Sequence, residues 1–191
     1  MSAPPTAPRG DASPWYRQPE TFIAFAALIV SVSAVVVGVY EASLQRAHDR
    51  AEVWPHLELE TFVEPKGASV YLENTGIGPG IVQSMVVTVD GHPERNWDEV
   101  VAALEGHPGT PYANTSAVDH ALPAGQRIAL LSIDRANLPS GFWPWIGRLG
   151  ITVCYRSVFD ERWQLASSHL GVRTSLRAVD RCPPQAPGTD L

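Results

Sequence analysis

The stretch that decides the fold is residues 21–40, TFIAFAALIVSVSAVVVGVY, which contains no charged side chain. An α-helix rises 1.5 Å per residue, so twenty residues give about 30 Å, the thickness of the hydrocarbon core of a bilayer. Trp15 and Tyr16 precede the stretch and Tyr40 ends it, as aromatic residues do at membrane interfaces. The sequence therefore predicts a transmembrane helix over residues 21–40.

A cleaved secretory signal is the competing interpretation, with small residues at positions 31–33 as the cleavage site. Two features favour a retained anchor. The leader, residues 1–20, is long, proline-rich and nearly neutral, and the apolar stretch exceeds the roughly 7–15 residues usual in a signal peptide. Five prolines and few aliphatic side chains also predict that residues 1–20 form a disordered head.

One face of the predicted span carries small side chains at helical spacing. Their intervals of 3, 4, 3 and 4 residues form a repeat that lets helices approach closely in lipid. Alanine is common in this chain, so chance explains the repeat equally well. A second copy of the chain or another membrane protein is the candidate partner of this face. The candidate helix-packing face consists of Ala24, Ala27, Ser31, Ala34 and Gly38.

The helix is expected to continue beyond the membrane as a stalk over residues 41–54. This segment contains no glycine or proline and is rich in good helix formers. Apolar residues continue at intervals of 4, 3, 4 and 3 from Tyr40 to Trp54, which forms a seam along the stalk. Pro55 then ends the helix, because a proline disfavours helical geometry in the residue before it.

A β-rich domain is expected over residues 55–178, because from His56 onward polar and apolar residues alternate. About seven short strands separated by turn residues predict a mainly-β domain, an antiparallel, immunoglobulin-like sandwich. One short inserted helix is expected over residues 96–105, with Trp97, Val100, Val101 and Leu104 on one face, and residues 179–191 are expected to be a flexible tail. The expected strands are residues 56–63, 68–73, 80–89, 127–133, 149–159, 162–168 and 172–176.

Residues 74–80, NTGIGPG, contain three glycines and invite a phosphate-binding interpretation. A P-loop requires the pattern G-x-x-x-x-G-K-[ST] and a following helix, whereas this segment has no lysine and precedes a predicted strand. A turn in which asparagine and glycine supply positive φ angles explains the same residues. We therefore expect a turn here and no phosphate site.

The two cysteines bear on which side of the membrane the domain lies. Cys154 falls in a predicted strand and Cys182 in the tail, 28 residues later. A disulfide between them and two unrelated thiols are both compatible with the sequence, and a disulfide would favour an oxidising compartment. Positive charges are almost balanced, with two arginines before the span and two soon after it. We expect a single-pass protein of the bacterial inner membrane, with a cytoplasmic N-terminus and a periplasmic domain.

The sequence contains no recognisable pattern of a catalytic, cofactor or metal site. The six histidines do not pair with one another or with a cysteine at metal-ligand spacing, and no G-x-S-x-G nucleophile elbow occurs. With 20 acidic against 14 basic residues, the formal charge of −6 excludes non-specific binding to nucleic acid. The sequence therefore predicts no cofactor and no nucleic-acid partner, and it favours a protein that is not an enzyme.

One apolar segment stands out in the β-rich region, residues 142–146, FWPWI. Phe142, Trp143 and Trp145 place much hydrophobic area in a short turn. Because tryptophan is usually largely buried, the favoured interpretation is that they plug one end of the sandwich. The alternative is that they rest on the membrane interface or on a partner protein, which makes this segment the candidate interaction loop.

A resemblance to known sequences rests on three fragments: residues 71–79, YLENTGIGP; residues 89–91, VDG; and residues 154–163, CYRSVFDERW. With the N-terminal span and a Trp-Pro pair after the stalk, they resemble a group of uncharacterised bacterial single-pass membrane proteins that share an ENTGxGP turn and a CYxSVFDxxW strand pair. The resemblance implies the architecture and no function. Members of that group tend to have further cysteines in the last fragment, where this chain has Arg156 and Arg162, so no local disulfide is carried over.

The sequence thus predicts a membrane-anchored β-sandwich that acts as an interaction or assembly module of the bacterial cell envelope. Its expected partners are the lipid bilayer and either a second copy of the chain or a membrane protein. The alternative is an envelope enzyme or metal-binding protein whose site forms only in three dimensions. A cleft that gathers histidines with aspartate or glutamate would favour the alternative, and a closed sandwich with scattered histidines would count against it.

Overall fold

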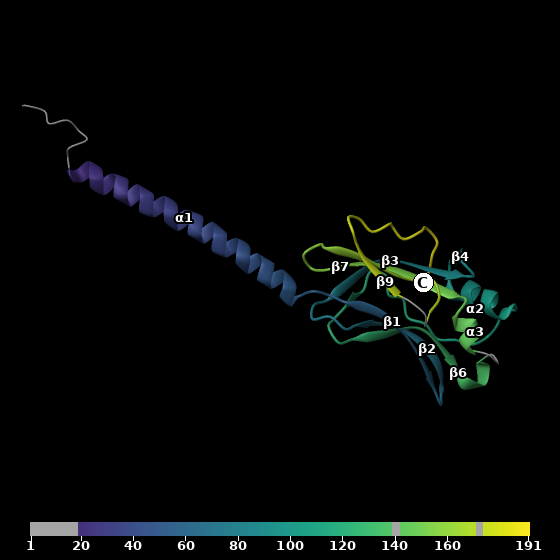
Figure 1. The fold of residues 1–191 in the computed structure, drawn as a ribbon. Helices are drawn as coiled ribbons and strands as arrows, with labels where there is room; N and C mark the ends of the chain where they lie inside the picture. Colours follow the sequence, from purple (N-terminus) through teal and green to yellow (C-terminus); the bar gives the residue numbers. More distant parts are fainter. Residues whose placement is uncertain (1–18, 139–141, 171–173) are drawn as a thin grey trace, which may run out of the picture. The chain divides into compact units, whose positions relative to one another are not determined.

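The computed structural model describes residues 19–138, 142–170 and 174–191. The chain divides into two compact units, one up to His48 and the other Asp49–Leu191. The first unit is most of a single long helix, and the second is a two-sheet domain with short helices (Figure 1). Each unit is described by itself.

Helix α1 (Pro19–Glu52) has 34 residues and begins at a proline, whose fixed φ suits the first position of a helix. Its part Pro19–Arg46 is long and apolar enough to cross a membrane. The large apolar side chains from Phe22 to Tyr40 are 53–70% exposed, so the chain itself does not cover them. The helix runs without a break past Tyr40 to Glu52, as the stalk prediction requires.

The domain is a sandwich of two antiparallel sheets, as the alternating pattern predicted. The smaller sheet has the order β1-β2-β6, and the larger has the order β4-β3-β7-β8-β9, with β5 paired to β3. The strands of the smaller sheet are β1 (Leu57–Glu64), β2 (Gly67–Asn74) and β6 (Arg127–Asp134). Those of the larger sheet are β3 (Gly80–Val89), β4 (His92–Glu94), β5 (Ala121–Leu122), β7 (Leu149–Arg156), β8 (Arg162–Ser167) and β9 (Thr174–Val179).

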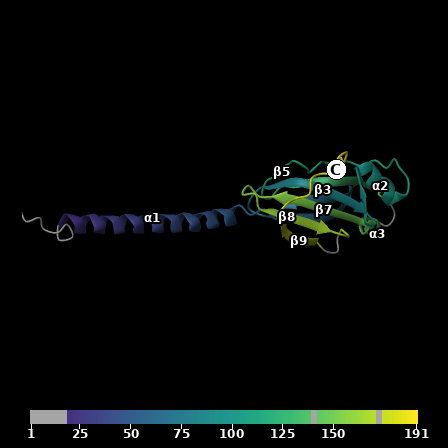
Figure 2. The same cartoon turned by 90° about the horizontal axis from the view of Figure 1, so that it is seen from above.

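The core lies between the two sheets and continues under one helix. Alternate residues of β2, among them Val70 and Leu72, face alternate residues of β7, among them Ile151 and Val153, and all four are buried. Helix α2 (Trp97–Glu105) closes the core at one end of the strands (Figure 2). Its buried residues are the four that the sequence placed on one face: Trp97, Val100, Val101 and Leu104.

Several short elements were not expected. Strands β4 and β5 have three and two residues, and a 3-10 helix, η2 (Arg135–Asn137), follows β6. Helix α3 (Phe142–Ile146) is a single helical turn at a place where the sequence predicted a loop. Strand β7 ends at Arg156, three residues early, because a turn begins at Ser157. The last strand, β9, is shifted toward the C-terminus, and the first two residues of the predicted strand, 172 and 173, lie outside the described part.

The expectation of a flexible tail after residue 178 is corrected by the structure, in which this segment is fastened to the domain. Cys182 forms a disulfide with Cys154. The Gln185 side chain accepts a 2.9 Å hydrogen bond from the backbone N–H of Met85, at a position where β3 lacks a neighbouring strand. Leu191 is buried, with only 2% of its surface exposed. We call residues 180–191 the C-terminal strap.

Candidate functional site

The strand register defines two ends of the sandwich. Strand β1 begins at Leu57, which pairs with Asn74 at the end of β2, and Ile81 near the start of β3 pairs with Arg156 at the end of β7. We call this end, where the chain arrives from α1, the proximal end. The opposite end, which carries the β1–β2 hairpin, α2 and α3, is the distal end (Figures 1 and 2).

Asn74 organises the proximal end. Its side chain is fully buried and makes four hydrogen bonds. Its Oδ1 accepts from the backbone N–H groups of His56 at 3.2 Å and Gly76 at 3.1 Å. Its Nδ2 donates to the carbonyl oxygens of Gly78 and Leu122, both at 2.8 Å. The amide group thus has its full set of partners, and it joins the segment before β1 to the turn at residues 74–80 and to β5.

The glycines of this turn are required for a different reason from the expected one. The positive φ angles in the described residues fall elsewhere, so the expectation of left-handed conformations at residues 74–80 is wrong. Instead, a Cβ on Gly76 would overlap the backbone of His56, and a Cβ on Gly78 would overlap the carbonyl group of Val53. The glycines let the turn lie directly against residues 53–56. No helix follows the turn, and β3 begins at its last residue, as the sequence predicted.

The β7–β8 turn is the second turn at the proximal end, and it is also held tightly. The N–H of Ser157 donates to the carbonyl oxygen of Glu161 at 2.9 Å, and the Ser157 hydroxyl accepts from the N–H of Phe159 at 3.1 Å. Asp160 has a φ of 65° and contacts the guanidinium groups of Arg156 and Arg162 at 3.8 and 2.6 Å. The two arginines therefore balance Asp160, one of the two acidic residues of this turn.

The candidate interaction loop lies at the distal end. Trp145 is buried there, as the favoured interpretation predicted, whereas Trp143 of the same helical turn is 62% exposed. The side chain of Phe142 lies outside the described part of the structure. Helix α3 comes just before the first residue of β7, Leu149, so it lies at the opposite end of the strands from Val53. The loop therefore divides its tryptophans between the core and the surface.

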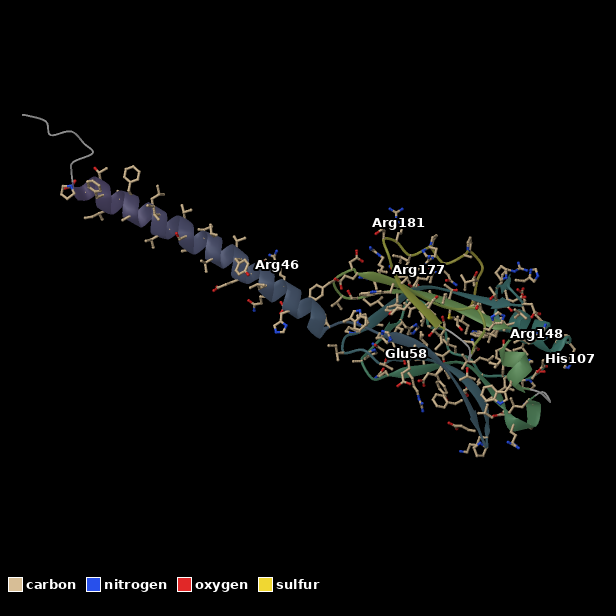
Figure 3. All side chains as sticks on the ribbon, viewed as in Figure 1. Arg46, Glu58, His107, Arg148, Arg177 and Arg181 are labelled. Carbon is tan, nitrogen blue, oxygen red and sulfur yellow. A yellow bond between two sulfur atoms is a disulfide. The ribbon has the colours of Figure 1, made fainter. Side chains whose placement is uncertain are left out.

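Arg148 joins three segments at the distal end. Its Nη2 lies 2.6 Å from Asp90, and its Nη1 and Nη2 donate to the carbonyl oxygens of Leu104 and Ala103 at the end of α2. The guanidinium group also donates hydrogen bonds to the Asp90 carboxyl, and these bonds are the main reason that the pKa of this carboxyl lies below its usual range. Figure 3 shows Arg148 at this end of the domain. The contact fixes the last turn of α2 against the β3–β4 connection.

A groove of about 420 Å³ runs beside this ion pair and is lined by Thr88, Thr152, Ser168 and His169 among others. The Ser168 hydroxyl lies 3.1 Å from Nδ1 of His169. A nucleophile activated by histidine also needs its base to be oriented by a third group. Within the described part of the chain, the side-chain hydrogen bond of His169 goes only to Ser168, its neighbour in sequence. The groove therefore presents polar groups without a nucleophile–base–acid arrangement.

The outer face of the smaller sheet carries a carboxylate pair. Burial raises the pKa of Glu60, and the neighbouring Glu73 raises it further by repulsion and by a hydrogen bond. Arg127 lies over the Tyr71 ring, with 4.8 Å between the guanidinium carbon and the ring centroid. Its positive charge offsets part of the rise in the pKa of Glu60. Figure 3 shows Glu58 on this sheet as well. The arrangement is a partly compensated acidic surface.

The candidate helix-packing face lies on the exposed part of α1. Its five small residues occupy the middle of the segment that is apolar enough to cross a membrane. A Cβ added to Gly38 would meet no atom within 4 Å, so the chain itself leaves this face open to a second helix. The structure holds one copy of the chain and leaves the helix-packing prediction untested.

In residues 19–138, 142–170 and 174–191, no group of three or more histidine, cysteine, aspartate or glutamate residues is placed to hold a metal ion. Two of the histidines lie at opposite ends of the domain, His56 at the proximal end and His107 at the distal end. No protein-family model matches the chain. No curated protein matches its sequence.

Sequence reasoning missed two of these features. The hydrogen bonds of Asn74 could not be predicted from the sequence, because its partners His56 and Leu122 are 18 and 48 residues away. The contact between Arg148 and the end of α2 spans 44 residues and has no local pattern. The one local signal was an asparagine at the end of an alternating strand, followed by three glycines at residues 76, 78 and 80, because closely spaced glycines can also mark a close backbone approach.

Proposed function

We propose that this protein is a membrane-anchored β-sandwich that acts as an interaction or assembly module of the bacterial cell envelope. Helix α1 is the anchor, and the two-sheet domain is the part that meets other molecules. The observation that carries the proposal is the exposure of the large apolar side chains along α1, from Phe22 to Val39. Exposure of such a surface to water is unfavourable in free energy, whereas contact with the hydrocarbon core of a bilayer is not.

The backbone and the hydroxyl groups of α1 suit a bilayer. All backbone hydrogen bonds of a helix lie within the segment, as a spanning structure requires. Ser33 Oγ donates to the carbonyl oxygen of Ile29 at 2.8 Å, and Ser43 Oγ donates to that of Tyr40 at 2.7 Å. The Ser33 hydroxyl therefore enters lipid with a partner already in place, and the Ser43 hydroxyl is paired in the same way just after the predicted span.

The disulfide supports a periplasmic domain. Cys154 and Cys182 are bonded to each other, and disulfides persist in oxidising compartments such as the bacterial periplasm. The domain would then lie outside the inner membrane, with residues before α1 in the cytoplasm. The exposed Trp143 at the distal end is the candidate contact for an envelope partner, because tryptophan is enriched where proteins meet.

The anchor and its orientation are tested together in bacterial cells. The full chain is expected in the membrane pellet after washing with alkaline carbonate, which strips peripheral proteins. An alkaline phosphatase fused after Leu191 should be active, because that enzyme folds only in the periplasm, and a β-galactosidase fusion at the same position is the matched control. Release of the chain by carbonate contradicts the anchor, and an active β-galactosidase fusion reverses the orientation.

Self-association of the span is tested by changing the candidate helix-packing face. Leucine in place of Ala27 and Gly38 should abolish crosslinking between copies in membranes, because the larger side chains separate the helix backbones. Leucine in place of Ile29 and Val36 is the matched control, since at about 100° per residue these positions lie on the opposite side of the helix. Equal crosslinking in both double variants would remove this face as a contact.

A further inference from the structure

The proximal end of the sandwich carries apolar side chains where polar ones are usual. Ile77, in the turn before β3, is 65% exposed, and Val158 and Phe159, in the β7–β8 turn, are 50% and 44% exposed. Trp54, next to the start of β1, is 42% exposed. Tight turns favour glycine, proline, asparagine, aspartate and serine, so large apolar residues at two turn tips need an explanation.

These side chains share one end of the domain. The N–H of Ile77 donates to the carbonyl oxygen of Trp54 at 3.1 Å, which holds the first turn against the segment before β1. Ile81 pairs with Arg156, so the residues just before Ile81 and just after Arg156 extend beyond the same strand ends. We call Trp54, Ile77, Val158 and Phe159 the proximal apolar tips.

The tips are presented by well-fixed backbone. The four side-chain hydrogen bonds of Asn74 and the close approach of Gly78 to Val53 hold the first turn. Buried Ser157 holds the second turn through its hydroxyl and its N–H. The turns therefore keep the apolar side chains outward, where collapse onto the core would otherwise cover them.

The length of α1 limits how far this end can lie from a membrane. At 1.5 Å per residue its 34 residues are about 51 Å long, and a bilayer with its headgroups is about 40–45 Å thick. Only about 10 Å of helix remains outside the headgroups, whatever the angle between the helix and the sandwich. The proximal end follows α1 after a few residues of chain, so this connection keeps it within reach of the lipid surface.

The charges at the tips are compatible with such a surface. The β7–β8 turn carries two acidic residues, Asp160 and Glu161, and Asp160 is paired with Arg156 and Arg162, which reduces its repulsion from lipid phosphates. Exposed apolar residues beside arginine match the boundary between headgroups and acyl chains, which accepts both.

From these observations we infer that the proximal apolar tips dock the sandwich onto the surface of the bilayer that α1 crosses. The inference rests on the proposed anchor, and it assigns the lipid interface as the ligand of Ile77, Val158 and Phe159. It also gives the two ends of the domain different tasks. The proximal end faces lipid, and the distal end, with Trp143, faces away from it.

The test uses the full chain in lipid vesicles, with a single added cysteine labelled by an environment-sensitive fluorophore. The native cysteines are bonded to each other, so only the added thiol reacts. Reporters are placed at Ile77→Cys and Phe159→Cys, with His107→Cys at the distal end as the control and Val30→Cys in α1 as the marker of the anchor. Lipids carrying a spin label near the headgroup then quench any fluorophore that lies at the interface, and lipids labelled deep in the acyl chain quench Val30→Cys.

Both tip reporters should be quenched at least about twice as strongly as the distal reporter, since interfacial side chains enter the headgroup boundary. Phe159→Asp should return the Ile77→Cys reporter to the level of the distal one. Val63→Asp should not, because Val63 is similarly exposed, at 46%, but lies in β1 near the distal end.

The outcomes separate the two proposals. Deep quenching of Val30→Cys with tip reporters no different from the distal one overturns the docking and leaves the anchor standing. Lack of quenching at Val30→Cys overturns the anchor, and the docking falls with it.

Discussion

Asn74 shows how a single side chain can hold together segments that are distant in sequence. An amide has two acceptor sites and two donors, and here all four are used inside the domain. An aspartate of the same shape could not donate twice, and an alanine would leave two N–H groups and two carbonyl oxygens without partners. The residue type is therefore dictated by its contacts.

Asn74→Ala is expected to lower the free energy of unfolding by about 2–4 kcal/mol. Removal of the amide group leaves its buried partners without hydrogen bonds. The measurement is urea unfolding of the full chain in detergent, followed by tryptophan fluorescence. Thr75→Ala is the neighbouring control. Thr75 is exposed, and its hydroxyl makes one long bond of 3.3 Å, so about 0.5 kcal/mol or less is expected. Equal losses in the two variants would contradict the role of Asn74.

Glu60 should make the domain less stable as the pH rises. Its pKa in the folded domain is raised above the ordinary value of 4.5 by burial and by Glu73. A carboxyl group with a raised pKa contributes its full stability below the ordinary value, and the contribution is lost as the pH rises through the folded pKa. Glu60→Gln should therefore flatten the dependence of the unfolding midpoint on pH above 4.5 and raise the midpoint at neutral pH.

The control for this prediction is Glu64→Gln, which removes the same charge from the exposed end of the same strand. Its unfolding midpoint should follow the pH dependence of the wild type. A Glu60→Gln variant that is less stable than the wild type at neutral pH would contradict the sign of the predicted effect.

At the level of elements, α2 depends on one distant side chain. Its start is capped locally, since Asn96 accepts a hydrogen bond from the N–H of Glu99, and its end has a left-handed Gly106. The carbonyl oxygens of Ala103 and Leu104 are satisfied by Arg148, which belongs to the segment before β7. The last turn of the helix is thereby joined to the sheet that it covers.

Arg148→Ala is expected to lower the free energy of unfolding by about 1–2 kcal/mol, because charge-assisted bonds to helix-terminal carbonyls are lost. Hydrogen exchange of the amides at the end of α2 should quicken. Asp90→Asn is the matched control, since it weakens the ion pair and leaves the contacts from Arg148 to the helix in place. The prediction fails if α2 loses as much protection in Asp90→Asn as in Arg148→Ala.

The larger elements were predictable, because each is specified by local pattern. The alternation of polar and apolar residues predicted the longer strands of both sheets. The spacing of Trp97, Val100, Val101 and Leu104 predicted α2 with its buried face. Strands of two or three residues, such as β5 and β4, have no period to detect. The strap was missed because single contacts, such as that of Gln185, hold it.

The surfaces were less predictable than the elements. Phe142, Trp143 and Trp145 attracted attention as apolar residues in one segment, but only the structure separates buried Trp145 from exposed Trp143. Ile77 lay in the expected turn and Phe159 at the end of an expected strand, and neither position predicted exposure, because exposure at a turn tip depends on where the neighbouring backbone lies. The proximal apolar tips come from turns about 80 residues apart, and pairing within the larger sheet brings them to one end.

For the whole domain, the C-terminal strap links its two ends. It leaves β9 at the proximal end, is bonded to the middle of the larger sheet at Cys154, and reaches the distal end, where the N–H of Asp190 donates to the carbonyl oxygen of Arg95 at 2.8 Å. Between these points Gln185 satisfies the N–H of Met85. The strap thus covers a stretch of the β3 edge that would otherwise be open to another strand.

Replacing both Cys154 and Cys182 by serine should test how far the strap depends on its covalent tie. The disulfide spans 28 residues of sequence, and in the chain-entropy model its loss costs about 3–4 kcal/mol of unfolding free energy. The Met85 amide should also exchange faster in the double variant, because the untied strap would leave β3 more often. Gln185→Ala, which breaks only the hydrogen bond, should expose the same amide with a loss of about 1 kcal/mol. Equal exchange at Met85 in the wild type and the double-serine variant would mean that the non-covalent contacts of Gln185, Asp190 and Leu191 hold the strap without the disulfide.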